Sequence, residues 1–414
     1  MDDRKRALAL SFAKEKFGEY YARPQSRLEP PSGLASREFG FLFFGEKFML
    51  RHKRFPSAAE LGAFLRDAVP SDAYHSTALY SDPEAEMEEK GWLGADLCFD
   101  IDADHLEAPC KFEHDRWACA CGAMGAGPAP KACPECGAEG LKEEAWMCES
   151  CLERAKDELL KLIEVLRSDF GIARSEMSAY FSGHRGYHLH VRSEEIRKLG
   201  ESERREMVDY LMGIGIDPSI HGLPTSPRGY PGRIPSPGDP GWAGRLSKAV
   251  SEILARYGEE ELEAIGLAPK AAKAIAGERD SLLEDWLGGK GWRLRRCAGG
   301  KGWGAIVRRA IELASVNIDT VVTTDVHRLI RLPGSLNGKT GLVVMPLGLE
   351  GIEKFEPFSD AVAFTGEEKI HIMESPKLRL GGEGFGPYKD ETVTLPTSAA
   401  LLLICKGKAY PAVD

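Results

Sequence analysis

Acidic residues alternate with apolar ones in the segment FDIDADH, residues 99–105. Residues two positions apart in a strand lie on the same face, so Asp100 and Asp102 can share one hard cation such as Mg²⁺ through oxygen ligands. Phosphoryl and nucleotidyl transfer need a further acidic ligand, so that two cations can flank the reacting phosphate. Asp319 and Asp325 are both candidates, and their spacing does not separate them. The alternatives are a solvated strand face without metal and the D-x-D of a sugar transferase.

A second group of candidates lies in SGHRGYHLHV, residues 182–191, a pattern typical of a tight turn between two strands. Glycines flank the turn, so its backbone can approach a ligand closely. Arg185 offers a planar fork suited to phosphate oxygens, and Ser182 and His184 stand beside it in the sequence. His188 follows on the second strand. The group predicts a cradle for a triphosphate, and the alternative is an ordinary polar turn with solvated histidines.

A third motif, HRLIRLPGSLNGKTGL at residues 327–342, combines Arg328, Arg331 and Lys339 with two glycine-containing turns. Its glycine spacing does not match the G-x-x-x-x-G-K-[ST] of a P-loop. Basic side chains close to an acid-bound metal would complete a site for a polyanion. The alternative is a basic surface loop with ordinary turn glycines.

Seven of the ten cysteines fall between residues 110 and 151. In a chain without a secretion signal, this crowding indicates metal rather than disulfides, and free cysteines would leave seven reactive thiols in one stretch. Seven cysteines and one histidine suffice for two tetrahedral zinc sites, a zinc ribbon enclosed by an outer site. His105 is the alternative to His114 as the single histidine ligand. The ribbon ligands are Cys119, Cys121, Cys133 and Cys136, and the outer ligands are Cys110, His114, Cys148 and Cys151.

Hydrophobic patterning predicts the elements that must position these groups. Ser57 and Glu60 form a capping box that starts a helix, and Gly171 lies just past the end of a longer one. One α/β core with two insertions and a C-terminal extension is the simplest account, and two independent domains are the alternative. The expected elements are strands within 38–55, a helix from 57, a strand within 94–105, a helix at 151–171, strands within 176–191, a loop at 222–241, helices over 243–315 and strands from 318 onward.

The composition is that of a globular chain, with 43% hydrophobic and 29% charged residues in 414. No apolar run is long enough to cross a membrane, and residues 1–21 lack the apolar core and cleavage site of a signal peptide. These features favour an intracellular protein. The formal net charge of −10 argues only weakly against a nucleic-acid binder, because basic clusters occur at 51–54, 293–296 and 327–331.

In their order along the chain, the three motifs resemble the active-site motifs of the small catalytic subunit of archaeal and eukaryotic DNA primases. EFGFLFFGEKFMLRHKRF (38–55) and CESCLERAKDELLKL (148–162) are also similar to the archaeal members, and the resemblance covers roughly residues 35–345. It implies an α/β (α+β) fold: the archaeo-eukaryotic primase core with an RRM-like half, a zinc-binding insertion and a helical insertion.

The resemblance also implies roles for individual residues. Asp100 and Asp102 match the paired ligands of two Mg²⁺ or Mn²⁺ ions, and Asp319 is favoured over Asp325 because the family's third aspartate lies a dozen residues before the basic residue matched by Arg331. Eukaryotic members carry arginine where this chain has His184 and histidine where it has Asn337. The outer zinc site matches the family's zinc knuckle, whereas 119–136 is an additional ribbon-like insertion. The predicted nucleotide-binding residues are Ser182, His184, Arg185, His188, Arg331, Asn337 and Lys339.

The resulting hypothesis is a DNA primase catalytic subunit, a nucleotidyltransferase of DNA replication that makes short RNA or DNA primers on single-stranded DNA. Its expected core spans 1–345, interrupted by a zinc-binding insertion at 105–151 and a helical insertion at about 222–315, and 346–414 extends the core. The implied partners are a large regulatory subunit in a heterodimer, template and primer, and nucleoside triphosphates, in the cytoplasm of an archaeal cell and without membrane contact. The alternatives are a related primase-polymerase of repair or primer extension and a non-enzymatic zinc protein that binds nucleic acid.

Overall fold

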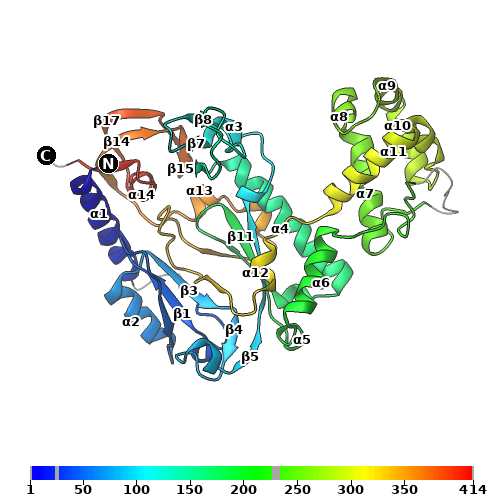
Figure 1. Ribbon diagram of the computed structural model, residues 1–414. Coiled ribbons are helices and arrows are strands. Elements are labelled where there is room, and N and C mark those ends of the chain that lie inside the picture. The colour runs from blue at the N-terminus through cyan, green and yellow to red at the C-terminus, as the bar shows by residue number, and fades with distance from the viewer. Residues whose placement is uncertain (1, 24–27, 226–233, 413–414) are drawn as a thin grey trace. The chain divides into compact units, whose positions relative to one another are not determined.

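The computed structural model describes residues 2–23, 28–225 and 234–412 (Figure 1). Among these residues every pairing of named strands is antiparallel, and helices stand between the strands along the chain without joining them into parallel pairs. This arrangement confirms the predicted α+β class. The chain forms two compact units: Met1–Leu160, Arg174–Arg204 and Ile318–Asp414 make the first, and Lys161–Ala173 and Arg205–Asn317 make the second.

The first sheet of the first unit has the strand order β12-β3-β1-β2. Its core face is aromatic, because Phe39 and Phe41 of β1 are fully buried and pack against Phe55 and Phe64. The adjoining helix α2 begins after Ser57, whose hydroxyl accepts the backbone N–H of residue 60, as the capping box predicted. The elements are β1 (Phe39–Leu42), β2 (Leu50–Lys53), α2 (Ala58–Ala68), β3 (Asp72–Ser76) and β12 (Leu329–Arg331).

The second sheet has the order β13-β10-β11-β6, so β6 is an edge strand. Leu97, Phe99 and Ile101 of β6 are fully buried, while Asp100 and Asp102 on the other face are half-buried. This alternation confirms the predicted strand and its two faces. The strands are β6 (Leu97–Asp102), β10 (Met177–Phe181), β11 (Gly186–Val191) and β13 (Met345–Leu347).

The C-terminal part of the first unit contains a three-stranded sheet of order β17-β14-β18 and the apolar helix α14. Every residue of α14 from Thr397 to Ile404 is buried, because the helix packs against α1 and β14 (Figure 1). Gly407 ends the helix at φ +69°, a left-handed conformation that favours glycine. The elements are α1 (Asp3–Tyr21), β14 (Glu367–Ser375), β15 (Leu378–Leu380), β16 (Glu383–Phe385), β17 (Tyr388–Pro396), α14 (Thr397–Cys405) and β18 (Ala409–Pro411).

The cysteine-rich stretch forms a small sheet of order β8-β7-β9, followed by the long helix predicted at 151–171. Leu159, Leu162 and Leu166 are fully buried along one stripe of that helix, which confirms the helical spacing read from the sequence. The elements are α3 (Lys111–His114), β7 (Arg116–Ala118), β8 (Met124–Ala126), β9 (Lys142–Glu144) and α4 (Glu149–Phe170).

The second unit is helical in its described part, with a core that includes Trp286, Trp303, Leu246 and Ile306. Helices were expected over 243–315, and the loop expected at 222–241 falls partly on 226–233, outside the described residues. Helix α11 contains a kink at Gly299, where φ is +67°. The helices are α6 (Glu201–Met212), α7 (Gly241–Arg256), α8 (Glu259–Ala264), α9 (Pro269–Gly277), α10 (Arg279–Leu287) and α11 (Trp292–Ala314).

The part of the chain after residue 318 corrects the sequence analysis. Strand was expected from residue 318 onward, but Thr320–Thr324 forms the helix α12, because the Asp319 carboxylate caps its N-terminus. Pro357–Asp360 and Thr397–Cys405 are helical as well. No described helix is both long and apolar enough to cross a membrane. The other short elements are β4 (Ala78–Tyr80), β5 (Trp92–Ala95), α5 (Glu194–Arg197), α13 (Pro357–Asp360) and the 3₁₀ turns at Leu34–Ser36, Met87–Glu89, Ala103–His105, Arg174–Glu176 and Ile352–Lys354.

Candidate active site

The carboxylate pair stands on the edge strand of the second sheet. Asp100 lies opposite His188 and Asp102 opposite Gly186 in the antiparallel pairing of β6 with β11. The backbone N–H of Asp319 donates to the carbonyl of Asp100 at 2.9 Å, which brings the third aspartate to the same strand. The two strands and the start of α12 therefore gather three carboxylates from distant parts of the sequence.

Asp319 and Asp325, which spacing left undecided, have different surroundings. The Asp319 side chain accepts the N–H groups of Val321 and Val322 at 2.8 and 3.3 Å, so it is fixed at the N-terminus of α12. Asp325 follows that helix and accepts the N–H of His327 at 2.8 Å. The contact of Asp319 with β6 favours it as the third member of the carboxylate group.

The three carboxylates lie close enough to repel one another. Burial, and then the negative charges of Asp102 and Asp319, raise the pKa of Asp100 to about 7. The charges of Arg328 and Arg331 oppose this rise without cancelling it. Oxygen donors that share uncompensated negative charge suit Mg²⁺ or Mn²⁺.

The turn between β10 and β11 is closed by Ser182. Its hydroxyl accepts the N–H groups of His184 and Gly186 at 3.3 and 3.2 Å, and its own N–H donates to the Gly186 carbonyl. Gly183 has φ +72°, and a Cβ there would lie 2.8 Å from the Cβ of Asn337. Glycine is thus required where the turn meets the third motif.

Asn337 joins the two motifs instead of facing solvent. It is fully buried, its amide donates to the Ser182 carbonyl at 3.0 Å, and its side-chain oxygen accepts the Lys339 N–H at 3.0 Å. The Thr340 hydroxyl also donates to the carbonyl of Gly183. Asn337, which was predicted to bind nucleotide, is therefore placed to position the turn that carries the other candidates.

Two arginines of the predicted cradle are held by carboxylates of the protein. Arg331 forms an ion pair with Asp72 of β3 and lies 5.2 Å from the ring centroid of Tyr74. Arg185 forms an ion pair with Asp104, whose backbone N–H donates to Asp102. Asp72 and Asp104 thus fix the two guanidinium groups. The sequence indicated either a metal contact or a structural role for Asp104 and no role for Asp72.

The histidines of the second strand are not solvated. His188 and His190 are 5% and 1% exposed, which contradicts the alternative of an ordinary polar turn. Burial, and then the charges of Arg331 and Arg328, lower the pKa of His188 to about 3, so its ring is neutral. His188 Nε2 lies 3.6 Å from Asp100 Oδ1, and its Nδ1 has no partner among the described residues.

Lys406 at the end of α14 is a site residue that sequence reasoning missed. Its ammonium donates to His184 Nε2 at 3.0 Å, and burial together with this charge holds the pKa of His184 well below its ordinary value. The charges of Arg185 and Lys339 act on the Lys406 ammonium as well. The only sequence signal was one of two lysines after an apolar segment, far from every motif.

The outer zinc ligands of the sequence prediction come together around the start of α4. Their ligand atoms all lie within 4.8 Å of one another, with Cys110 Sγ 3.3 Å from Cys151 Sγ and His114 Nε2 3.5 Å from Cys151 Sγ. Asp115 binds His114 Nδ1 at 2.7 Å and so leaves Nε2 for a metal. His105 belongs to neither metal-ligand group of the described chain. The group is Cys110, His114, Cys148 and Cys151.

The four ribbon cysteines form a second group of the same size. Cys119 Sγ lies 3.6 Å from Cys136 Sγ, and Cys121 Sγ lies 3.8 Å from Cys133 Sγ. Donation from the Cys136 backbone N–H is the largest cause that lowers the pKa of Cys133 to about 7, which favours the thiolate that zinc binds. Both clusters can therefore hold a tetrahedral metal ion.

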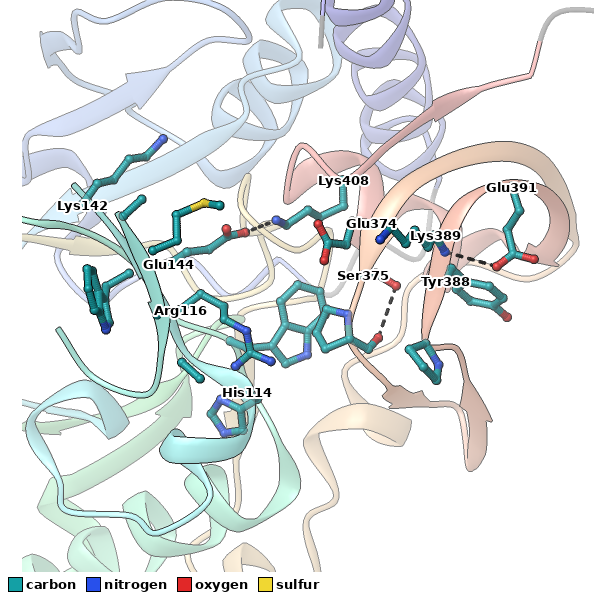
Figure 2. A pocket seen from close by; sticks show the side chains of 18 residues that line it. His114, Arg116, Lys142, Glu144, Glu374, Ser375, Tyr388, Lys389, Glu391 and Lys408 are labelled. Atoms are coloured by element: carbon teal, nitrogen blue, oxygen red, sulfur yellow. Dashed lines mark hydrogen bonds and ion pairs between the residues drawn. The ribbon is translucent and has the colours of Figure 1, made fainter. Parts of the chain in front are cut away.

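A cavity of about 800 Å³ separates the small sheet β8-β7-β9 from the C-terminal strands (Figure 2). Arg116 and His114 line one side of it, and Tyr388 lines the other. Lys408 reaches across and pairs with Glu144. Because its cationic and acidic side chains are similar in number, this cavity lacks the excess positive charge of the cradle.

The comparisons with known proteins agree with this geometry. The family model for the DNA primase small subunit matches residues 99–349. A "DNA primase small subunit PriS" from Cenarchaeum symbiosum is 36% identical over 97% of this chain and 99% of its own length. Those from Archaeoglobus fulgidus and Methanothrix thermoacetophila are 37% and 35% identical, each over at least 96% of both chains. This chain therefore belongs to the DNA primase small subunit family.

Proposed function

We propose that this chain is the catalytic subunit of a DNA primase and joins nucleoside triphosphates into short RNA or DNA primers on a single-stranded DNA template. The observation that carries the proposal is the meeting of three carboxylates, Asp100, Asp102 and Asp319, with a basic turn on one sheet. Family membership supports the same activity.

In the proposed reaction the oxygen of a primer 3′-hydroxyl attacks the α-phosphorus, and the bond to the β-phosphate breaks to release pyrophosphate. Asp100, Asp102 and Asp319 would hold two Mg²⁺ or Mn²⁺ ions, since their donor set is all oxygen and their charge is uncompensated. Bound there, such ions supply a lowered pKa for the attacking hydroxyl and charge for the leaving pyrophosphate. Arg185 and Arg331, each already fixed by a carboxylate, would orient the triphosphate.

The remaining nucleotide contacts divide into direct and indirect ones. Lys339 is exposed, so its ammonium is available to phosphate oxygens. His188 Nδ1 is buried without a partner among the described residues, and a phosphate contact of this atom is part of the same proposal. Ser182 and Asn337 use their polar atoms within the protein and would act by positioning the turn. His184 is neutral and would accept from Lys406 rather than neutralise phosphate itself.

The decisive experiment measures incorporation of labelled nucleotides on a single-stranded template, with and without a large primase subunit. Replacing both Asp100→Asn and Asp102→Asn preserves shape and removes two charges, so synthesis should fall at least about a thousandfold. Activity that survives this change would overturn the metal assignment. Wild-type protein that retains DNA but shows no metal-dependent synthesis would point instead to a non-enzymatic zinc protein.

Two zinc ions per chain are proposed to stabilise the cysteine-rich stretch. Elemental analysis of the purified protein should give two zinc atoms, and Cys133→Ser should leave one. Cys148→Ser should also lower the unfolding temperature, because Cys148 immediately precedes the long helix α4. One zinc atom in the wild-type protein would remove one of the two ligand sets.

The expected partner is the large regulatory subunit, in a heterodimer that acts with the chromosome in the cytoplasm of an archaeal cell. The domain limits of the sequence analysis belong to the same proposal: a core at 1–345 with insertions at 105–151 and about 222–315, and an extension at 346–414. Co-expression followed by size-exclusion chromatography tests the partnership, because a one-to-one complex should elute ahead of this chain alone.

A further inference from the structure

The C-terminal helix α14 delivers a cation to the predicted nucleotide cradle from outside the segment that the family model matches. Lys406 stands directly after this helix, and its ammonium lies 3.0 Å from His184 Nε2. The same ammonium lies 5.8 Å from the ring centroid of Trp146, at a distance suited to a cation–π contact. Lys406 is thus held between the triphosphate-binding turn and an aromatic ring.

The position of Lys406 is fixed by packing, not by an ion pair. Leu401 of α14 packs directly on Gly341 of the third motif, where an added Cβ would lie 2.6 Å from a Leu401 methyl carbon. Lys406 closes the helix through its backbone N–H to the Leu402 carbonyl, and Gly407 turns the chain away. This packing therefore fixes helix α14 against the turn that carries Lys339.

Lys406 lies among other charged side chains but has no ion pair of its own in the described chain. Within the described part of the chain, no carboxylate lies within ion-pairing distance of it or of Lys339. The charges of Arg185 and Lys339 act on its ammonium, and the two carboxylates that oppose them, Asp104 and Glu144, are already paired with Arg185 and Lys408. Like charges held together in a partly buried place are unfavourable unless a polyanion joins them.

Resting on the proposed function, we propose that Lys406 is a direct contact of the nucleotide triphosphate and of the leaving pyrophosphate, so that α14 completes the phosphate-binding site. Arg185, Lys339 and Lys406 then surround the β- and γ-phosphates from three separate elements: the hairpin turn, the third motif and the C-terminal helix. His184 accepts a hydrogen bond from the Lys406 ammonium and so orients this ammonium toward the same ligand.

The test uses the full chain with Lys406→Met, Lys406→Arg and the matched control Lys408→Met. Lys408 lies two residues further along and pairs with Glu144 at the cavity of Figure 2, and it has no hydrogen bond or ion pair with His184 or Arg185 among the described residues. Two quantities are measured: the KM and kcat for nucleotide in primer extension, and the Kd for inorganic pyrophosphate by calorimetry, which needs no synthesis. A shared unfolding temperature shows that the variants fold.

Lys406→Met should raise the KM for nucleotide and the Kd for pyrophosphate about tenfold, with a smaller change in kcat and in affinity for single-stranded DNA. Lys406→Arg should recover both to within about threefold, and Lys408→Met should change neither. Unaltered pyrophosphate affinity in Lys406→Met would overturn the inference while wild-type synthesis leaves the proposed function standing. Absence of wild-type synthesis, with pyrophosphate binding that still depends on Lys406, would overturn the proposed function alone.

Discussion

The two ends of the candidate site balance their charges in opposite ways. At the carboxylate end, no described cationic side chain pairs with Asp102 or Asp319, and the closest basic group to Asp100 is His188, which is neutral. Burial and mutual repulsion consequently raise the pKa of Asp100 to about 7. The negative charge that remains at this end suits a cation that the protein does not itself supply.

At the cation end, two cationic side chains are paired with carboxylates of the protein and two are not. Arg331 and Arg185 are paired with carboxylates of the protein, whereas Lys339 and Lys406 have none within reach in the described chain. Guanidinium groups that are already held by carboxylates can orient a ligand, whereas ammonium groups without an ion pair add net positive charge. A nucleoside triphosphate with bound metal ions, as proposed for this site, would balance the remaining charge of both ends at once.

The largest expected effect comes from the carboxylate end. Asp319→Asn should lower the rate of primer synthesis at least about a thousandfold, because it removes a proposed metal ligand while asparagine still caps α12. Asp325→Asn, six residues further along, should change the rate less than about threefold. Rates with Mg²⁺ and with Mn²⁺ should be measured for both variants. Equal losses of rate in Asp319→Asn and Asp325→Asn would show that Asp319 is not the third member of the carboxylate group.

Breaking one of the balanced pairs should cost stability as well as activity. Arg331→Met leaves Asp72 buried without its partner, and the free energy of unfolding should fall by about 3–5 kcal/mol. Lys339→Met removes an exposed, unpaired charge, so stability should stay within about 0.5 kcal/mol while nucleotide affinity falls. Urea denaturation compares the two variants, and Arg331→Met combined with Asp72→Asn should recover much of the loss. A similar loss in the free energy of unfolding for Arg331→Met and Lys339→Met would refute the division into paired and unpaired cations.

The sequence was sufficient for features that depend on local periodicity and short spacing. The alternation in β6 predicted which side chains are buried, and the glycines around residues 182–186 predicted the hairpin turn. The two cysteine groups also followed from spacing, because zinc ligands come in close pairs. The alternation and the turn are determined within a few residues of the chain, and each metal-ligand group is built from two such short pairs.

Features that depend on tertiary packing were out of reach. Asp72 and Lys406 reach the site from β3 and α14, and neither lies in a motif that announces its partner. The strand expected at 320–324 is a helix because the Asp319 side chain caps it, a contact that competes with β-branched propensity. Side chains that balance another residue's charge cannot be identified until the fold has placed that residue.

A smaller effect is expected where the two motifs are joined. Asn337→Ala removes the amide that donates to the Ser182 carbonyl and leaves that carbonyl unpaired, at a cost of about 1–3 kcal/mol in stability. Because the turn would shift, the KM for nucleotide should rise with little change in kcat. Thermal unfolding and steady-state kinetics report the two effects. A rise in KM with unchanged stability would instead make Asn337 a direct phosphate contact.

The smallest effect concerns the pH dependence of the unpaired lysine. Burial, and then the charges of Arg185 and Lys339, lower the pKa of Lys406 to about 8, while Asp104 and Glu144 oppose this shift. Lysine binds phosphate in its charged form, which is present below this pKa and lost above it, so the Kd for pyrophosphate should rise about three- to tenfold between pH 7 and pH 9. Lys406→Arg keeps its charge throughout this range and should show a flat profile in the same calorimetric titration. A rise of equal size in Lys406→Arg would assign the pH dependence to another group.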